Sequence, residues 1–367
     1  MERSAEAELI AGEAGAATES EKPPYPPSWV DWVTDRVDRL PMPAWLFYLA
    51  VGLALAFLYI GISWANRSIN WDNGNYLRSA PFQLRLLMAL SPAIIMGMTH
   101  YFDDWAEAAL ASFRPAMALD DTEYENLRYQ LTTMPRLQTL VANVIGVAVG
   151  SIYVLALSPD LINQFQFYAS PPGTVSDVMM FLLDFLVYSI LIYHTIHQLR
   201  MVSRIYAKCL QVDLFQLGPL YAFSTLAARI AISIALMTSA WIYAISLGRS
   251  DNVVYLLAPF VAIPLLVVTF ILPLTGIHGI LQQEKRRLQG ENSLHIKATI
   301  QELHRRAETG EYGQMDGVNK AMDSLVKEQT VLDKIPTWPW QPETIRWVGT
   351  ALLLPIILAV VTRLLLR

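Results

Sequence analysis

The sequence lacks most of what a soluble enzyme needs. It has one cysteine, Cys209, so no disulfide can form within the chain. Only 16% of its residues are charged, whereas about a quarter are charged in soluble domains. The motifs GxxxxGK[ST], GxGxxG after a strand, GxSxG, HExxH and CxxC are all absent. We therefore predict no catalytic residue, no metal ligand set and no cofactor, and we favour a non-enzymatic protein.

Apolar residues are abundant, at 54% of the chain, and they are grouped. Seven runs are each about as long as the roughly 20 residues that a helix needs to cross a bilayer. They fall at 44–64, 82–100, 139–157, 178–197, 226–247, 253–275 and 347–366. None alternates in the manner of a barrel strand. The fold class predicted is all-α: a polytopic integral membrane protein with about seven transmembrane helices and a cytoplasmic helical hairpin. The second run is the weakest, because Arg85 and Pro92 interrupt it.

Lysine and arginine gather in the loops on one side of the predicted spans. These loops hold Arg36 and Arg39, then Arg114, Arg128 and Arg136, then Arg200, Arg204 and Lys208, and finally the basic residues between Lys285 and Arg346. The loop at 158–175, on the other side, has none. The positive-inside rule predicts a cytoplasmic N-terminus and an external C-terminus. The location expected is a plasma or inner membrane.

Four regions follow from these patterns. Residues 1–27 are rich in Ala, Glu, Gly and Pro and predict a disordered cytoplasmic tail. Residues 28–280 form a membrane domain, with a short interfacial helix capped by Ser28 before six spans. Residues 281–340 form an amphipathic helical hairpin and a Pro/Trp-rich linker. Residues 341–367 form the seventh span. Between the second and third spans, Asp120 is expected to cap a cytoplasmic helix that ends before Pro135.

Asp184 lies inside the fourth run, roughly 10 Å from its outer end. A charged acid at that depth costs a few kcal/mol, so a partner or a water-filled cavity is expected. Arg85 is at a matching height, and we predict that the two residues pair. Tyr188 and Thr195 continue the face of Asp184 and make a polar stripe. The four residues are candidates for a pore or for an ion or proton site, although a buried pair that only fixes helix packing is an equal alternative.

Histidines are placed near the cytoplasmic ends of the even-numbered spans. They are His100, His194, His197 and His278. Histidine changes charge near neutral pH, so we name them as candidates for pH sensing. A metal site made with nearby carboxylates is a weaker alternative, because His-x-x-His on one helix is a common pattern.

Two further features concern helix geometry. Pro259, Pro264 and Pro273 interrupt the sixth run and are hinge candidates, since proline removes a backbone donor. Small residues recur every fourth position in the third and fifth runs, which is typical of close helix packing within the chain or between subunits. They are Ala142, Gly146 and Gly150, and then Ala227, Ala231, Ala235 and Ser239.

These features favour an ion channel or membrane sensor. The alternatives are a membrane enzyme with a cytoplasmic-face His/carboxylate metal site, and a scaffold or assembly factor. The partners expected are the lipid bilayer, a second copy of the chain in a homo-oligomer, and a cytoplasmic protein at residues 281–340. No nucleic-acid partner is expected.

Overall fold

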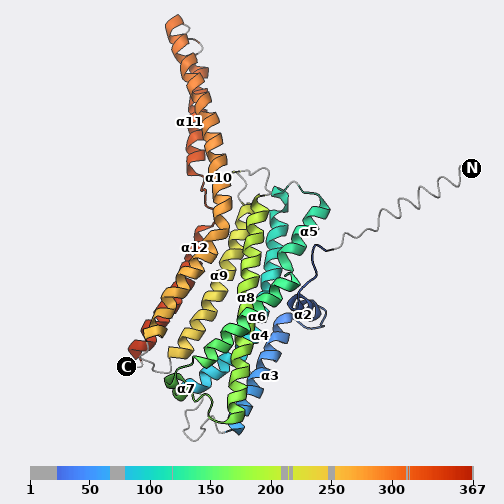
Figure 1. The fold of residues 1–367 in the computed structure, drawn as a ribbon. Coiled ribbons are helices and arrows are strands. Elements are labelled where there is room, and N and C mark those ends of the chain that lie inside the picture. The colour runs from blue at the N-terminus through green and yellow to red at the C-terminus, as the bar shows by residue number, and fades with distance from the viewer. Residues whose placement is uncertain are drawn as a thin grey trace, which may run out of the picture.

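A computed structural model describes residues 23–66, 79–117, 119–207, 214, 218–246, 253–310, 313 and 315–365. Over these residues the fold is all-helical, as predicted: 87% of the structure is helix and no strand is present, with helices α2 to α12 and a short 3₁₀ turn, η2. Five described helices are long and apolar enough to cross a membrane: α3 (Ala44–Ala65), α4 (Ala80–Phe113), α6 (Arg136–Leu155), α8 (Pro171–Ala207) and α9 (Gly218–Ser246). They stand side by side as a bundle (Figure 1). The seven spans predicted from the sequence are not confirmed.

The N-terminal helix α2 (Trp29–Asp38) begins where the sequence predicts. The Ser28 side chain accepts hydrogen bonds from the first turn, and the Asp31 carboxylate accepts one from Ser28 N in return. Residues 23–27 were included in the predicted tail, but they lie against the junction of α5 and α6. Arg136 N donates to Pro26 O, and the Tyr25 hydroxyl donates to Thr133 O. The remainder of the predicted tail, residues 1–22, lies outside the described residues.

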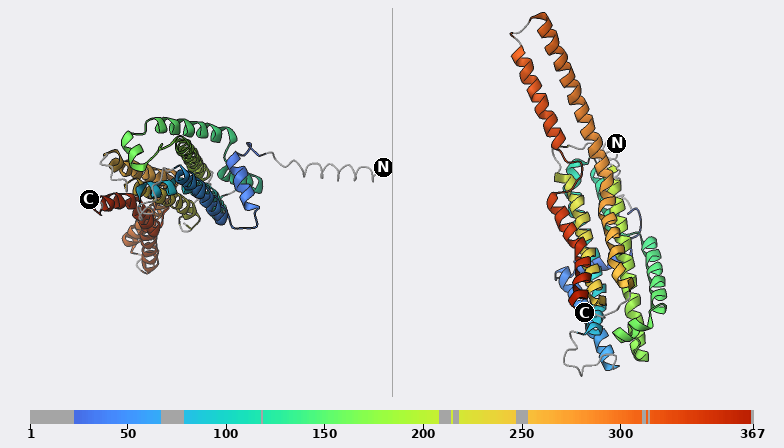
Figure 2. Two further views of the ribbon diagram at one scale, coloured as in Figure 1. Left: turned by 90° about the horizontal axis from the view of Figure 1, so that it is seen from below. Right: turned by 90° about the vertical axis from the view of Figure 1, so that its left-hand side faces the viewer.

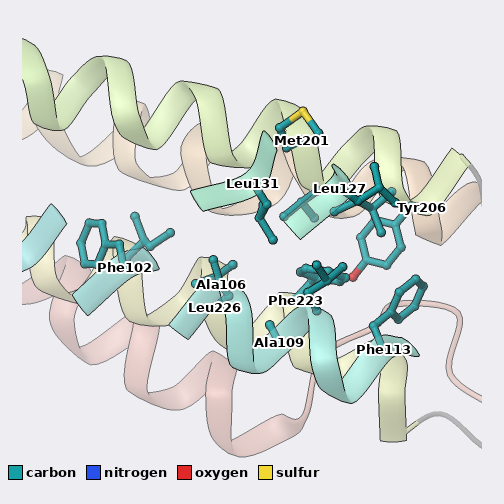
Figure 3. Close-up of a cluster of buried hydrophobic side chains, with 14 of the residues drawn as sticks. Phe102, Ala106, Ala109, Phe113, Leu127, Leu131, Met201, Tyr206, Phe223 and Leu226 are labelled. Atoms are coloured by element: carbon teal, nitrogen blue, oxygen red, sulfur yellow. The ribbon is translucent and has the colours of Figure 1, made fainter. Parts of the chain in front are cut away.

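On the hairpin side of α2, the helices pack around a second group of buried side chains, here called a layer. Figure 3 shows its centre, where side chains of α4, α5 (Asp121–Thr132), α8 and α9 meet. Its buried members include Phe102, Ala106, Phe113, Leu127, Leu131, Met201, Tyr206 and Phe223. Asp120 accepts from Glu123 N and caps α5, as predicted. Helices α4 and α8 are long enough to cross a bilayer and still contribute to this layer. A turn of 3₁₀ helix, η2 (Arg114–Ala116), ends α4.

Helix α10 (Val253–Thr309) has 57 residues and runs from the bundle into the hairpin without a break. It pairs with α11 (Met315–Lys334) to form the hairpin, which projects away from the bundle (Figure 2). The backbone is helical at all three candidate hinge prolines, whose side chains lie outside the described residues. No helix boundary falls at residue 281. Glu284, Arg287 and Glu291 form ion pairs one turn apart there and favour continued helix.

The last helix, α12 (Pro342–Leu365), lies beside α9 (Figure 1). The small residues Ala227, Ala231 and Ala235 are buried in the α9 face that receives Val348 and Ala351. Gly146 and Gly150 of α6 likewise face Ser189 and Phe185 of α8. Both predicted stripes therefore pack helices of one chain together.

The approach of α6 to α8 leaves no room for a side chain at Gly146. A Cβ there would lie 2.5 Å from Ser189 Cβ and 2.8 Å from the Phe185 carbonyl oxygen. We expect Gly146→Ala to destabilise the protein by roughly 1–3 kcal/mol, because the backbone must shift. Thermal unfolding in detergent measures this. Gly61→Ala is the matched control, since no atom lies within 4 Å of its Cβ position. Equal melting temperatures for both variants would contradict the packing described.

Candidate functional site

Asp184 lies within the bundle, with 3% of its surface exposed. Its Oδ1 is hydrogen-bonded to Ser91 Oγ of α4, and its Oδ2 has no hydrogen-bond partner among the described residues. No cationic side chain of the described residues forms an ion pair with it. An ionised carboxylate buried without a cation is costly, by several kcal/mol. The packing therefore favours the neutral, protonated carboxyl.

The residue next to Ser91 gives a second reason for that protonation state. Pro92 has no N–H group, so the Met88 carbonyl four residues earlier loses its helical hydrogen bond. Ser91 Oγ lies 3.1 Å from this Met88 oxygen and is also bonded to Asp184. A hydroxyl has one hydrogen. If it is donated to Met88, the bond to Asp184 requires a hydrogen on the Asp184 carboxyl.

The stripe predicted on the Asp184 face of α8 is buried and incompletely satisfied. Thr195 Oγ1 and Gln198 Oε1 are buried atoms without a hydrogen-bond partner among the described residues, and the buried Tyr188 Oη interacts with the Trp241 side chain of α9. With Asp184 they lie within about 40° of one line along the helix, over about 21 Å. Buried polar atoms are normally paired with protein or water, and exceptions call for an explanation. These four polar residues form one file along α8.

The hairpin-side end of this file is joined to α4 through Asp103. Gln198 Nε2 and His194 Nε2 both donate to Asp103 Oδ1, each at 2.9 Å. His194 was predicted to lie outside the Asp184 site, and it contacts the file only at this end. Asp103 also lines a cavity outside the bundle. The file therefore runs from the middle of α8 to an open surface.

That cavity has a volume of about 710 Å³ and lies between α2, α4 and α5. Seven carboxylates line it: Asp31, Asp35, Asp38, Asp103, Asp104, Glu107 and Glu125. His100 and Arg128 are its basic residues, and Arg128 is within 3.4 Å of both Glu107 and Glu125. The excess of carboxylates attracts protons and cations.

Each of the four predicted pH-sensing histidines joins a bundle helix to another element. His100 donates through Nε2 to Asp38 of α2, at 2.9 Å, and its Nδ1 is bonded to the Tyr48 hydroxyl. His197 Nε2 donates to the Gln130 carbonyl of α5 at 2.7 Å. His278 Nδ1 donates to the Thr337 carbonyl at 3.0 Å, and its ring stacks on Trp338. With His194 they form four separate contacts, and they do not converge on one site.

Arg85 is fully buried near the opposite end of the bundle. Its guanidinium donates to the carbonyls of Phe165 and Gln166, each at 2.8 Å. These carbonyls end the short helix α7 (Pro159–Phe165), where Gln166 has a φ of 56°. The acid beside Arg85 is Asp177, at 4.0 Å. The predicted pairing of Arg85 with Asp184 is therefore wrong.

Asp177 joins Arg85, Tyr59 and Tyr168 in one set of polar contacts at this end of the bundle. It accepts from the Tyr59 hydroxyl at 2.7 Å and from Tyr168 N at 2.9 Å. The sequence contained a signal for it, because Asp177 precedes Asp184 by two helical turns on the same face of α8 and lies nearer the height of Arg85. The bonds that Arg85 donates to the carbonyls at the end of α7 had no such signal in the sequence. Asp103, Ser91 and Gln198 were also missed, although Gln198 follows the Asp184 face.

Within the described residues, no group of three or more His, Cys, Asp or Glu side chains is arranged to hold a metal ion. The chain matches no protein-family model, no curated protein and no solved structure. The function must therefore be argued from the geometry of the file and the cavity.

A double-mutant cycle tests the partner of Arg85. We expect Arg85→Gln to couple with Asp177→Asn by roughly 0.5–3 kcal/mol, because the two side chains share one polar group. With Asp184→Asn the effects should add to within about 0.5 kcal/mol. Unfolding by denaturant in detergent micelles measures both cycles. A larger coupling with Asp184 would restore the pairing predicted from the sequence.

Asp31 supplies a pH prediction outside the spans. Burial raises the pKa of its carboxyl from 3.8 to about 6, although Ser28 N and Met134 N donate to it. Since the folded pKa exceeds the unfolded value, the protonated form stabilises the fold. This contribution is complete below pH 4 and is lost as the pH rises through about 6.

Asp31→Asn should remove this part of the pH dependence. The largest change in the free energy of unfolding that this carboxyl can cause is roughly 3 kcal/mol, because its pKa rises from 3.8 to about 6 on folding. We expect the wild-type melting temperature to fall between pH 5 and pH 7 by more than that of the variant. Asp35→Asn, on the same helix, is the control. Melting temperatures of wild type and Asp31→Asn that change by the same amount between pH 5 and pH 7 would contradict the role of this carboxyl.

Proposed function

We propose that the protein is a non-enzymatic membrane sensor of proton concentration, in which Asp184 is the proton-binding group. The observation that carries the proposal is the hydrogen bonding around Ser91, where Pro92 leaves the Met88 carbonyl to be satisfied by the serine hydroxyl. When the Ser91 hydroxyl donates to Met88, Asp184 carries the hydrogen of its own bond to Ser91. Deprotonation of Asp184 changes both the charge and the hydrogen bonding between α4 and α8.

Protons reach Asp184 from the hairpin side in this proposal. The acidic cavity concentrates them, Asp103 receives them, and the file of Gln198, Thr195 and Tyr188 leads inward from there. Transfer over about 21 Å requires water molecules between these polar groups. Support comes from the shared bonds of His194 and Gln198 to Asp103, which connect cavity and file.

The conformational response to pH follows from the position of α8. An ionised Asp184 has no cationic partner in the packed bundle, so alkaline pH favours an arrangement that gives it water or a cation. Movement of α8 disturbs the contacts of His194 with Asp103 and of His197 with Gln130. These contacts hold α4 and α5 in place. Acid pH therefore favours the packed form, and alkaline pH loosens the layer formed by α4, α5 and α8.

A sensor is favoured over the channel alternative by the group around Arg85. Its buried guanidinium, held by two carbonyls, lies on the far side of Asp184 from the cavity. Arg85 and the adjacent Asp177 are both buried and bonded to neighbouring groups, which favours a closed end of the bundle over an open path for cations. We further propose seven spans with a cytoplasmic N-terminus, α12 and the first part of α10 completing the five spans described.

Infrared spectroscopy of the reconstituted protein tests the proton-binding group. A carboxylic acid band should disappear as the pH is raised, and Asp184→Asn should lack that band. Asp160→Asn, which alters an exposed carboxyl on α7, is the control. We expect Pro92→Ala to lose the band at a lower pH than wild type, because the freed Ser91 hydroxyl then donates to the carboxylate.

Hydrogen exchange measured on the same samples tests the conformational response. In wild type, the protection factors of amides in α5 and in the hairpin-side half of α8, which are corrected for the base-catalysed intrinsic exchange rate, should be lower at alkaline than at acid pH. Asp184→Asn should keep the protection factors of the acid form at every pH. An unchanged pH response in Asp184→Asn would reject the sensor. Ionic current across a planar bilayer, altered by this substitution, would favour the channel instead.

A further inference from the structure

A second concave surface lies on the outside of the bundle, on helices that are long and apolar enough to cross the membrane. It is a groove of about 420 Å³ between α3 and α4, with Ser233 of α9 at one side. Its lining is almost entirely apolar: Trp45, Leu49, Gly52, Leu90, Ala93, Ile94, Gly97, Met98 and Trp105 are among the residues. Ile94 on the α4 side of the groove is 43% exposed, although neighbouring α4 residues are buried.

Two glycines let α3 and α4 approach closely along the groove. A Cβ at Gly97 would lie 3.3 Å from the Tyr48 ring, and one at Gly52 would lie 3.3 Å from Ala93. Larger residues at these positions would separate α3 from α4. From Leu90 to Trp105 the groove follows α4 for roughly 22 Å, at about 1.5 Å per residue. This length and its apolar lining suit one extended acyl chain.

A cation stands at the hairpin-side end of the groove. The guanidinium of Arg229 lies 5.3 Å from the ring centroid of Trp105, and Arg229 precedes the groove residue Ser233 by one turn of α9. Among the described residues no carboxylate is within ion-pair distance of Arg229. At 100° per residue, Asp103 and Glu107 lie on the face of α4 opposite Trp105. The acidic cavity therefore does not neutralise this cation.

We propose that the groove binds an anionic phospholipid from the leaflet on the hairpin side. One acyl chain lies along α4 between Leu90 and Trp105, and the phosphate is held by Arg229. Trp45 and Trp105 lie at the headgroup level, where tryptophan is enriched in membrane proteins. The choice of lipid follows from two features of the groove. It is apolar and about as long as an acyl chain, and it ends at the Arg229 guanidinium, a basic group of the kind that attracts anionic headgroups.

Native mass spectrometry of the full chain, purified in detergent, tests the site with phosphatidylglycerol and phosphatidylcholine. We expect one phosphatidylglycerol molecule to be retained in preference to phosphatidylcholine. Arg229→Gln should reduce that preference about fivefold, which corresponds to about 1 kcal/mol for one basic residue at an anionic surface. Arg200→Gln removes an exposed arginine of α8 and is the control for charge. It should leave the preference unchanged.

Filling the groove tests the acyl chain separately. Ile94→Trp and Leu49→Trp fill it from its two walls and should abolish retention of both lipids. Val144→Trp, at an exposed position of α6, is the control. Only variants whose melting temperature equals that of the wild type are compared. Retention unchanged by Arg229→Gln or by both filling variants would overturn the proposal. So would competition by inorganic phosphate, which identifies a free anion, or a lipid-free dimer abolished by Ile94→Trp, which identifies a second copy.

Discussion

The structure depends on how polar side chains of α8 are satisfied inside an apolar bundle. Burial of an unpaired polar group costs several kcal/mol where water is excluded, so each one constrains the helix that faces it. Asp177 holds Tyr59 of α3 and Arg85 of α4 at one end, and Asp103 of α4 is held by His194 and Gln198 at the other. Between these ends the polar atoms are only partly paired. Hydrogen bonds therefore hold α8 to α3 and α4 mainly at these two ends, and close packing at Gly146 and Gly150 holds the middle of α8 against α6.

This distribution gives one helix two roles. Paired polar groups at the ends of α8 set its position against α3 and α4. The unpaired groups between them retain the capacity to bind a proton or water. Removing a partner at an end should therefore affect folding, whereas removing the Asp184 carboxyl should affect the response to pH more than the fold. The groove proposed to bind a phospholipid lies on α3 and α4, outside the bundle, and is lined by residues other than those of the file.

Much of the fold was accessible from the sequence. Apolar runs located the five helices that are long enough to span, and Ser28 and Asp120 marked the starts of α2 and α5 because capping acts within four residues. The site was accessible only in part. The polar stripe of Asp184, Tyr188 and Thr195 follows from helix periodicity. The contacts of Arg85 were predicted wrongly, because Asp177 lies nearer its height than Asp184 does, and because the two carbonyls at the end of α7 to which it donates carry no sequence signal.

The continuity of α10 has a mechanical consequence. About 43 Å of this helix extends past residue 280, at 1.5 Å per residue, with α11 packed along it. A tilt of about 5° at the bundle would displace the distant end by about 4 Å. The buried Asn292 donates to the Leu325 carbonyl and to Gln329, which keeps α10 and α11 in register during such a motion. A small rotation of α10 at the bundle would therefore give a much larger displacement at the tip of the hairpin.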